Sequence, residues 1–89
     1  MAALDLLGRR WALRVLWELG SGPLTFRALR DACDAVSPTV LNARLGELRE
    51  AGLVDSTEEG YALTPHGRGL GRALAPLQRW SEKWAAGEG

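Results

Sequence analysis

The stretch SPTVLNARLGELREAG, residues 37–52, carries the strongest helix signals of the chain. Ser37 is a preferred N-cap residue, and Pro38 suits the first helical position, where its missing N–H would have no partner anyway. Three leucines then repeat at the spacing of a buried helical stripe: Leu41, Leu45 and Leu48. Gly52 is suited to the left-handed residue that ends a helix. The sequence therefore predicts an amphipathic helix over residues 37–51.

Shorter helices are predicted before this segment. Residues 2–7 form a helical lead-in that ends at Gly8, and residues 9–19 form a second helix. One face of that helix collects the apolar residues Ala12, Val15, Leu16 and Leu19. The run Gly20–Pro23 stops it, and Thr25 then caps another short helix. The apolar face of this short helix is formed by Phe26, Leu29 and Cys33.

A hairpin and a long helix are predicted after it. Residues 53–56 and 61–63 are short strand candidates around a turn, Thr57–Gly60. Thr64-Pro65 repeats the cap-plus-proline start for a final helix. Pro76 lies inside that helix, and we expect it to kink or divide the helix.

Without the lead-in helix, this order is helix–helix–helix–β–β–helix, which predicts a mainly α fold with a small β-hairpin, that of a winged helix-turn-helix protein. We expect a single winged helix domain over residues 1–89. It divides into a lead-in helix at 1–8, a winged helix core at 9–63 and a C-terminal dimerisation helix at 64–86.

In a winged helix the third helix enters the major groove of DNA, so the outward side of residues 37–51 is the expected contact surface. With the leucines inward, a step of about 100° per residue directs four small or hydrogen-bonding residues outward. They are Thr39, Asn42, Ala43 and Gly46. Asn hydrogen-bonds adenine in a bidentate manner, and Thr contacts a thymine methyl group. The exposed amides of residues 37–40 suit a phosphate. The alternative is an ordinary amphipathic helix with a small-residue solvent face.

The charge distribution opposes strong phosphate binding. The formal net charge is zero, but residues 1–30 hold five Arg against two acids (+3) and residues 61–89 hold four cations against two acids (+2). Residues 31–60, where DNA contacts are expected, hold two Arg against seven acids (−5). Four arginines flank the expected contact surface: Arg27, Arg30, Arg44 and Arg49. Eight such contacts per dimer would give a salt slope of about −7. A hairpin tip with Glu58 and Glu59 would stand clear of the phosphates or weaken non-specific binding.

The sequence gives no sign of a disulfide-bonded, membrane-spanning or catalytic protein. One Cys cannot form an internal disulfide, which indicates a reducing cytoplasm, and no segment is a membrane span or export signal. We expect Cys33 to be a buried small hydrophobe and His66 a surface or packing residue. The sequence holds no catalytic Cys–His or Ser–His–Asp set, no metal-ligand cluster and no cofactor motif, so we expect no enzyme, metal or cofactor.

The last helix carries an apolar stripe too long for one small core. It consists of Leu70, Ala73, Leu74, Leu77, Trp80 and Trp84. We expect its end to pack against a second copy, together with the N-terminal Leu4 and Leu7. Interface packing is the ordinary use of such tryptophans. The alternative is an aromatic cage at the dimer interface that binds a small flat effector.

Five motifs resemble those of the HxlR-type winged helix-turn-helix regulators, relatives of the MarR regulators. They are GRRWALRVLWEL (8–19), GPLTFRAL (22–29), VSPTVLNARLGELREAGLV (36–54), YALTPHG (61–67) and LQRW (77–80). The resemblance implies a cytoplasmic bacterial transcription regulator, homodimeric through its terminal helices, that binds double-stranded DNA at a pseudo-palindromic operator, most commonly as a repressor. The alternative function is a winged helix for protein–protein interaction or dimerisation that has lost strong DNA affinity.

Three positions depart from the family pattern. Thr25 stands where the family has Arg before Phe26, the hairpin tip is short and acidic where basic residues are expected, and the N-terminal Cys that some members use as a redox sensor is absent. For this chain the resemblance therefore predicts neither DNA contacts by the hairpin tip nor redox sensing by a thiol.

Overall fold

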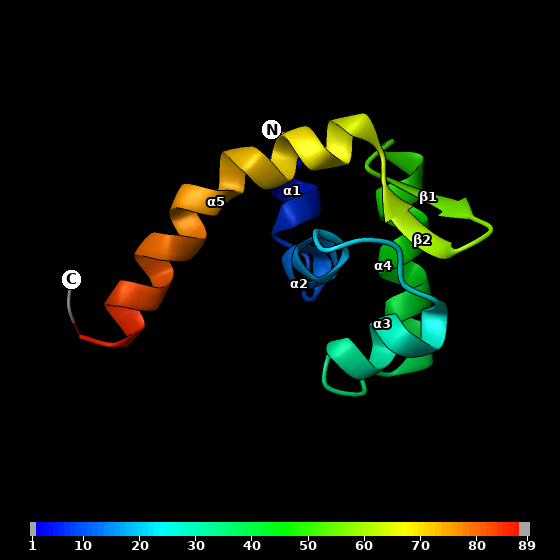
Figure 1. Ribbon diagram of the computed structural model, residues 1–89, viewed down its shortest axis with the longest axis horizontal. Helices are drawn as coiled ribbons and strands as arrows, with labels where there is room; N and C mark the ends of the chain where they lie inside the picture. The colour runs from blue at the N-terminus through cyan, green and yellow to red at the C-terminus, as the bar shows by residue number, and fades with distance from the viewer. Residues whose placement is uncertain (1, 88–89) are drawn as a thin grey trace.

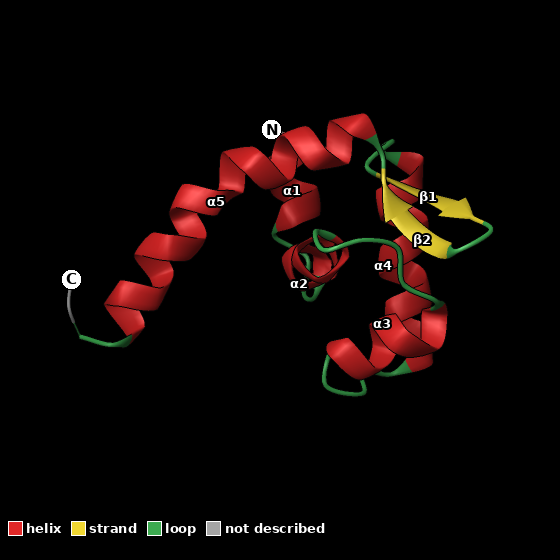
Figure 2. Ribbon diagram, viewed as in Figure 1, coloured by secondary structure: helices red, strands yellow, loops and turns green. Residues whose placement is uncertain are grey.

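The computed structural model describes residues 2–87, with side chains from residue 5. Its elements are α1 (Ala2–Leu7), α2 (Ala12–Leu19), α3 (Phe26–Ala32), α4 (Pro38–Glu50), β1 (Val54–Thr57), β2 (Gly60–Leu63) and α5 (Pro65–Ala85). Figure 1 shows α2, α3 and α4 gathered around one centre, with the hairpin beside α4 and α5 passing over α1 and α2. Figure 2 shows the single hairpin among the helices. This is the winged helix-turn-helix arrangement that the sequence predicts.

The core forms where α2, α3 and α4 meet. Its buried side chains are Val15, Leu16, Leu19, Leu29, Cys33, Val36, Leu41, Leu45, Leu48 and Val54. Each large apolar side chain buried in this way stabilises the fold by about 1.5–3 kcal/mol. The predicted apolar faces of residues 9–19 and 37–51 both lie in this cluster. Their helical spacing was therefore sufficient to locate the core.

The predicted ends of α4 are also confirmed. The backbone N–H of Val40 donates to Ser37 Oγ (3.2 Å), and Pro38 occupies the first turn. At the other end Gly52 has a φ of 76°. The N–H of Leu53 donates to the carbonyl of Leu48 (2.9 Å), and that of Gly52 to Arg49 (3.0 Å). These two bonds make a Schellman motif, which sends the chain directly into β1.

The hairpin turn is tighter than predicted. Thr57 pairs with Gly60, so the strands are one residue longer at the turn than expected and only Glu58 and Glu59 connect them. The Thr57 hydroxyl donates to the Gly60 carbonyl (2.8 Å) and accepts from the N–H of Glu59 (3.2 Å), and these bonds close the turn.

An additional bridge ties the hairpin to the α2–α3 connection. Leu24 pairs with Tyr61 through two backbone hydrogen bonds of 3.0 and 2.8 Å. Gly60 allows this approach, because a Cβ there would lie 2.5 Å from the Leu24 carbonyl oxygen. Strand β2 is therefore paired on both edges next to the turn, with Ser56 of β1 on one side and Leu24 on the other.

The last helix is continuous through Pro76. The expected division of the helix is wrong, since one missing N–H removes a single internal hydrogen bond and the turns on either side keep theirs. The helix bends along its length, and its C-terminal half projects away from the rest of the molecule (Figure 1). None of the described helices is both long enough and apolar enough to cross a membrane.

Two contacts fix the start of α5. Thr64 Oγ1 accepts the N–H of Gly67 (3.1 Å) and donates to the carbonyl of Gly52 (2.6 Å). Gly67 is buried so closely against Leu53 that an added Cβ would collide with the Leu53 carbonyl oxygen. The end of α4 and the start of α5 are thus joined side by side.

This close packing predicts opposite effects for two glycines of α5. Gly67→Ala should lower the free energy of unfolding by about 1–3 kcal/mol, because the methyl group has no space. Gly71→Ala should raise it by about 0.5–1 kcal/mol, because its Cβ meets nothing within 4 Å and Ala is the better helix former. Urea unfolding followed by tryptophan fluorescence measures both. Equal midpoints for the two variants would contradict the packing.

Candidate DNA-binding surface

The outward face of α4 is small and polar. Thr39, Asn42, Ala43 and Gly46 are all exposed, as the sequence predicts, while the leucines on the opposite face are at most 1% exposed. No bulky side chain rises from this part of the helix. The major groove of DNA can therefore approach the α4 backbone closely, with Asn42 and Thr39 as the hydrogen-bonding side chains.

The start of α4 offers fewer amides than expected. Pro38 has no N–H, and the N–H of Val40 is already bonded to Ser37 Oγ. Among the positions 37–40, the amides of Ser37 and Thr39 therefore remain suited to a phosphate at the positive end of the helix.

The four expected arginines fall into two pairs. Arg27 and Arg49 are exposed, Arg27 on α3 and Arg49 in the last turn of α4. Arg30 instead donates from Nε to the Val36 carbonyl (2.7 Å), which braces the connection before α4. Arg44 is only 18% exposed and lies 3.1 Å from Glu47. Arg27 and Arg49 are therefore the pair with charge available to DNA.

Glu47 also links α4 to the N-terminal segment. Its carboxylate lies 3.6 Å from Arg9 Nε, on the connection between α1 and α2. This pair was not predicted from the sequence. The i, i+3 spacing of Arg44 and Glu47 was a signal that Arg44 had a partner within its own helix, whereas nothing local indicated Arg9.

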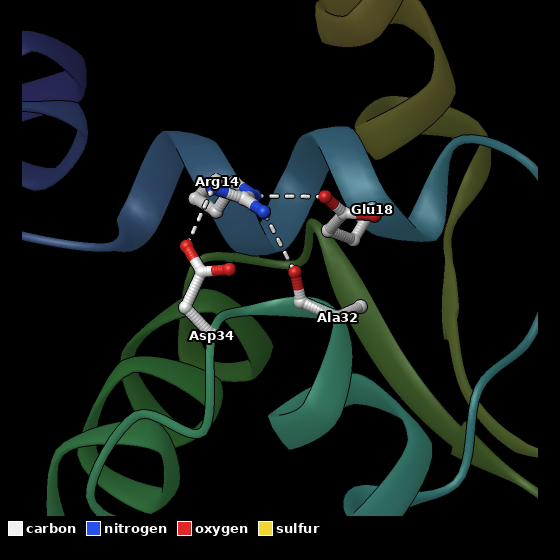
Figure 3. A network of polar contacts seen from close by, with 4 residues as sticks. All are labelled: Arg14, Glu18, Ala32 and Asp34. Atoms are coloured by element: carbon white, nitrogen blue, oxygen red, sulfur yellow. Dashed lines mark hydrogen bonds and ion pairs between the residues drawn. The ribbon is translucent and has the colours of Figure 1, made fainter.

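Arg14 holds the connection between α3 and α4 (Figure 3). From α2 it donates to Glu18 (2.7 Å), to the carbonyl of Ala32 at the end of α3 (2.7 Å) and to Asp34 (3.4 Å). The hydrogen bond with Glu18 raises the pKa of Arg14, so this side chain stays charged throughout the useful pH range. Asp34 and Ala35 both have a φ of 57°, a left-handed conformation that non-glycine residues rarely adopt. The i, i+4 spacing of Arg14 and Glu18 was a local signal for part of this network, whereas nothing local indicated Ala32 or Asp34.

The hairpin tip presents carboxylates to solvent. Glu58 and Glu59 are both exposed, and β1 is exposed from Asp55 onward. Within the described residues no group of three or more His, Cys, Asp or Glu side chains is placed to hold a metal ion.

Cys33 is a core residue. Its side chain is 0% exposed, and burial raises the pKa of its thiol, an effect that the nearby charge of Arg14 opposes. A neutral, inaccessible thiol is a poor nucleophile.

The terminal residues expected at a dimer interface differ in exposure. Leu77, Trp80 and Trp84 are 52%, 57% and 64% exposed on the projecting half of α5. The rings of Trp80 and Trp84 stack on each other, with centroids 5.8 Å apart and planes 7° from parallel. Leu74 and Leu7 are half-buried, and Leu7 packs against the core. The side chain of Leu4 lies outside the described residues.

This fold and this surface define a helix-turn-helix protein with a wing. A family model described as "HxlR-like helix-turn-helix" matches residues 6–88. The chain belongs to that family, whose members are transcriptional regulators. It is 32% identical over 89 residues to YvaP of Bacillus subtilis, an uncharacterized HTH-type transcriptional regulator, covering 92% of this chain and 82% of YvaP.

Solved structures agree with this assignment. The quinone-bound YodB of Bacillus subtilis superposes with a TM-score of 0.84 at 29% identity, over 92% of this chain and 93% of YodB. A candidate HxlR family transcription factor from Thermoplasma volcanium gives a TM-score of 0.86 at 28% identity, over 93% of this chain and 81% of that one. The winged-helix fold and the regulator class are therefore established.

The burial of Cys33 predicts slow alkylation. Native protein should react with iodoacetamide roughly tenfold or more slowly than protein unfolded in urea, because the thiol is reached only through local opening. Mass spectrometry measures the modified fraction over time. Equal rates in both states would show that Cys33 is accessible.

The same burial has a pH signature. Burial raises the pKa of the Cys33 thiol in the folded protein, so the thiol of the unfolded chain ionises at a lower pH. The stabilisation gained by burying the neutral thiol is therefore complete below the unfolded pKa of about 8.5. It is lost as the pH rises through the folded pKa.

Proposed function

We propose that this chain is a sequence-specific repressor that acts as a homodimer and places α4 of each protomer in the major groove of a pseudo-palindromic operator. The observation that carries the proposal is the outward face of α4, where Thr39, Asn42, Ala43 and Gly46 form an exposed surface of small and hydrogen-bonding residues. A merely solvated helix face commonly carries long charged side chains, and this face has none between residues 39 and 46; the exposed Glu50 follows on it one turn after Gly46.

The chemistry of this face suits base edges. The Asn42 amide both donates and accepts, as adenine N6 and N7 require. Thr39 offers a hydroxyl and a methyl group to a thymine. Ala43 and Gly46 contribute no long side chain, so they let the helix sit deep in the groove.

Phosphate binding falls chiefly to Arg27 and Arg49, with the Thr39 amide and Ser37 at the start of α4. Two arginines per protomer give four contacts in the dimer and a salt slope of about −4. The slope of about −7 expected from the sequence requires Arg30 and Arg44 to leave their intramolecular partners. The carboxylates of Glu58 and Glu59 oppose phosphates, so the tip of the wing lowers non-specific affinity.

Dimerisation through the projecting half of α5 follows from its exposed apolar side chains. Leu77, Trp80 and Trp84 are too exposed to stabilise the protomer, and burying them against a partner removes a large apolar area from water. Leu74, Leu7 and Leu4 would extend the contact towards the core.

A small aromatic effector at this interface is part of the proposal. The support is the solved complex of YodB with a quinone, together with the aromatic surface of Trp80 and Trp84. Because these two rings stack on each other, a flat ligand would lie against the outer face of the pair.

The rival function is protein–protein interaction without strong DNA binding. The net charge of −5 over residues 31–60 favours it, since DNA repels that segment. The two functions separate in fluorescence anisotropy with DNA from upstream of the gene and a scrambled duplex, between about 50 and 200 mM salt. Selective, salt-dependent binding supports the repressor, and no binding to either duplex at low salt overturns it.

Asn42→Ala should weaken binding to the selected upstream DNA by about 1–3 kcal/mol and leave binding to the scrambled duplex almost unchanged. Arg27→Ala is the contrasting variant. Arg27→Ala should weaken binding to the upstream DNA and to the scrambled duplex alike. It should also reduce the magnitude of the salt slope by about 2, because each dimer loses two phosphate contacts. Equal losses on both duplexes for Asn42→Ala would show that Asn42 contacts no base edge.

The double variant Trp80→Ala, Trp84→Ala should shift the protein towards monomer in sedimentation velocity experiments, because it removes the largest exposed apolar groups of α5. Arg79→Ala, on the same exposed helix, controls for changes in helix propensity and should sediment as the unmodified protein does. A double variant that remains dimeric would place the interface elsewhere.

A further inference from the structure

A groove separates the C-terminal end of α2 from the first half of α5. Its volume is about 510 Å³, within the range of about 300–1,000 Å³ that small-molecule sites occupy. Leu16 and Trp17 line it from α2, and Leu74 lines it from α5. Trp17 is 53% exposed, so a flat apolar ring surface is open to a ligand.

Two cations stand at this groove. Arg68 and Arg72 lie one turn apart on α5 and both line it. Arg68 donates from Nη1 to the Leu63 carbonyl (3.0 Å) and is exposed. The Arg72 side chain is exposed and makes no hydrogen bond or ion pair with any other residue of the described part of the chain. The one acid of the lining, Glu18, is bonded to Arg14 at 2.7 Å, so its charge is largely compensated.

We propose that this groove binds a small anionic aromatic molecule, whose ring packs against Trp17 and Leu74 and whose acidic group is bound by Arg72 and Arg68. The site lies within one protomer and shares no residue with the outward face of α4 or with the Trp80–Trp84 pair, although its wall residue Leu74 also borders the proposed dimer contact. It therefore does not depend on the DNA-binding proposal.

The charges select this occupant over a second copy of the chain. The exposed apolar stripe of another α5 would be the obvious competitor for an apolar groove. Lys83 lies three residues after Trp80, next to that stripe on the helix, and would approach Arg68 and Arg72 with like charge. A small anion instead places opposite charge beside the guanidinium groups, and a guanidinium binds a carboxylate or sulfonate through paired N–H donors.

The test uses anilinonaphthalene sulfonate, an aromatic anion whose fluorescence rises in an apolar site, and phenylnaphthylamine, its uncharged counterpart. We expect one sulfonate dye per protomer, with tryptophan quenching, and weaker binding of the uncharged dye. Arg72→Gln should weaken binding of the sulfonate dye about five- to tenfold, because it removes a charge-assisted hydrogen bond. Binding of the uncharged dye should be nearly unchanged. The matched variant Arg79→Gln, on the same helix but outside the groove, should change neither.

Filling the groove gives a second, independent test. Nothing lies within 4 Å of a Cβ at Gly71, which lines the groove, so a side chain can start there without a clash and Gly71→Leu adds volume to the groove. Gly71→Leu should abolish binding of both dyes, whereas Gly71→Ala should retain most of it, and circular dichroism checks that both variants fold. Dye binding unaffected by Gly71→Leu and Arg72→Gln, or no dye binding at all by the folded protein, would overturn the proposal.

Discussion

The hydrogen bonds of Arg14 hold the geometry on which the helix-turn-helix depends. The turn between α3 and α4 contains two consecutive left-handed residues, Asp34 and Ala35, and each costs about 1–2 kcal/mol relative to ordinary backbone. Arg14 binds the last carbonyl of α3 and the Asp34 carboxylate, while Arg30 binds the Val36 carbonyl from the other side. These contacts help to offset the strain, and they fix the direction in which α4 leaves the turn. The orientation of the outward face of α4 follows from that direction.

The sequence was sufficient wherever the signal was local. A cap residue, the proline after it and an apolar repeat determine a helix within a few turns, so the limits of α4, its buried leucines and its exposed face were all predicted correctly. The helix end at Gly52 and the helix start at Thr64 were also predicted correctly, because a helix end depends on its nearest neighbours in the sequence. The resemblance of the motifs to one family rests on the same residues, since several of them are caps, turns and core positions.

The sequence was insufficient where a side chain finds its partner across the fold. Arg30 and Arg44 are indistinguishable from Arg27 and Arg49 in a helical projection, yet the structure gives the first two internal partners. The bridge between Leu24 and Tyr61 and the contact of Gly67 with Leu53 join segments that only the folded core brings together. Pro76 shows how far a strong local breaker acts, because it does not divide the helix when the turns around it are intact.

The joint at Thr64 and Gly67 has a mechanical consequence for the proposed dimer. The hydroxyl of Thr64 joins the end of α4 to the start of α5, and the close contact at the buried Gly67 limits how far the two helices can move relative to each other. Helix α5 has 21 residues, so at about 1.5 Å per residue it is a lever of about 30 Å. A tilt of about 6° at the joint moves its far end by about 3 Å, close to the rise of one base pair along one strand. In the proposed dimer, the spacing between the two α4 helices would therefore depend on how rigidly one threonine and one glycine hold two helix ends together.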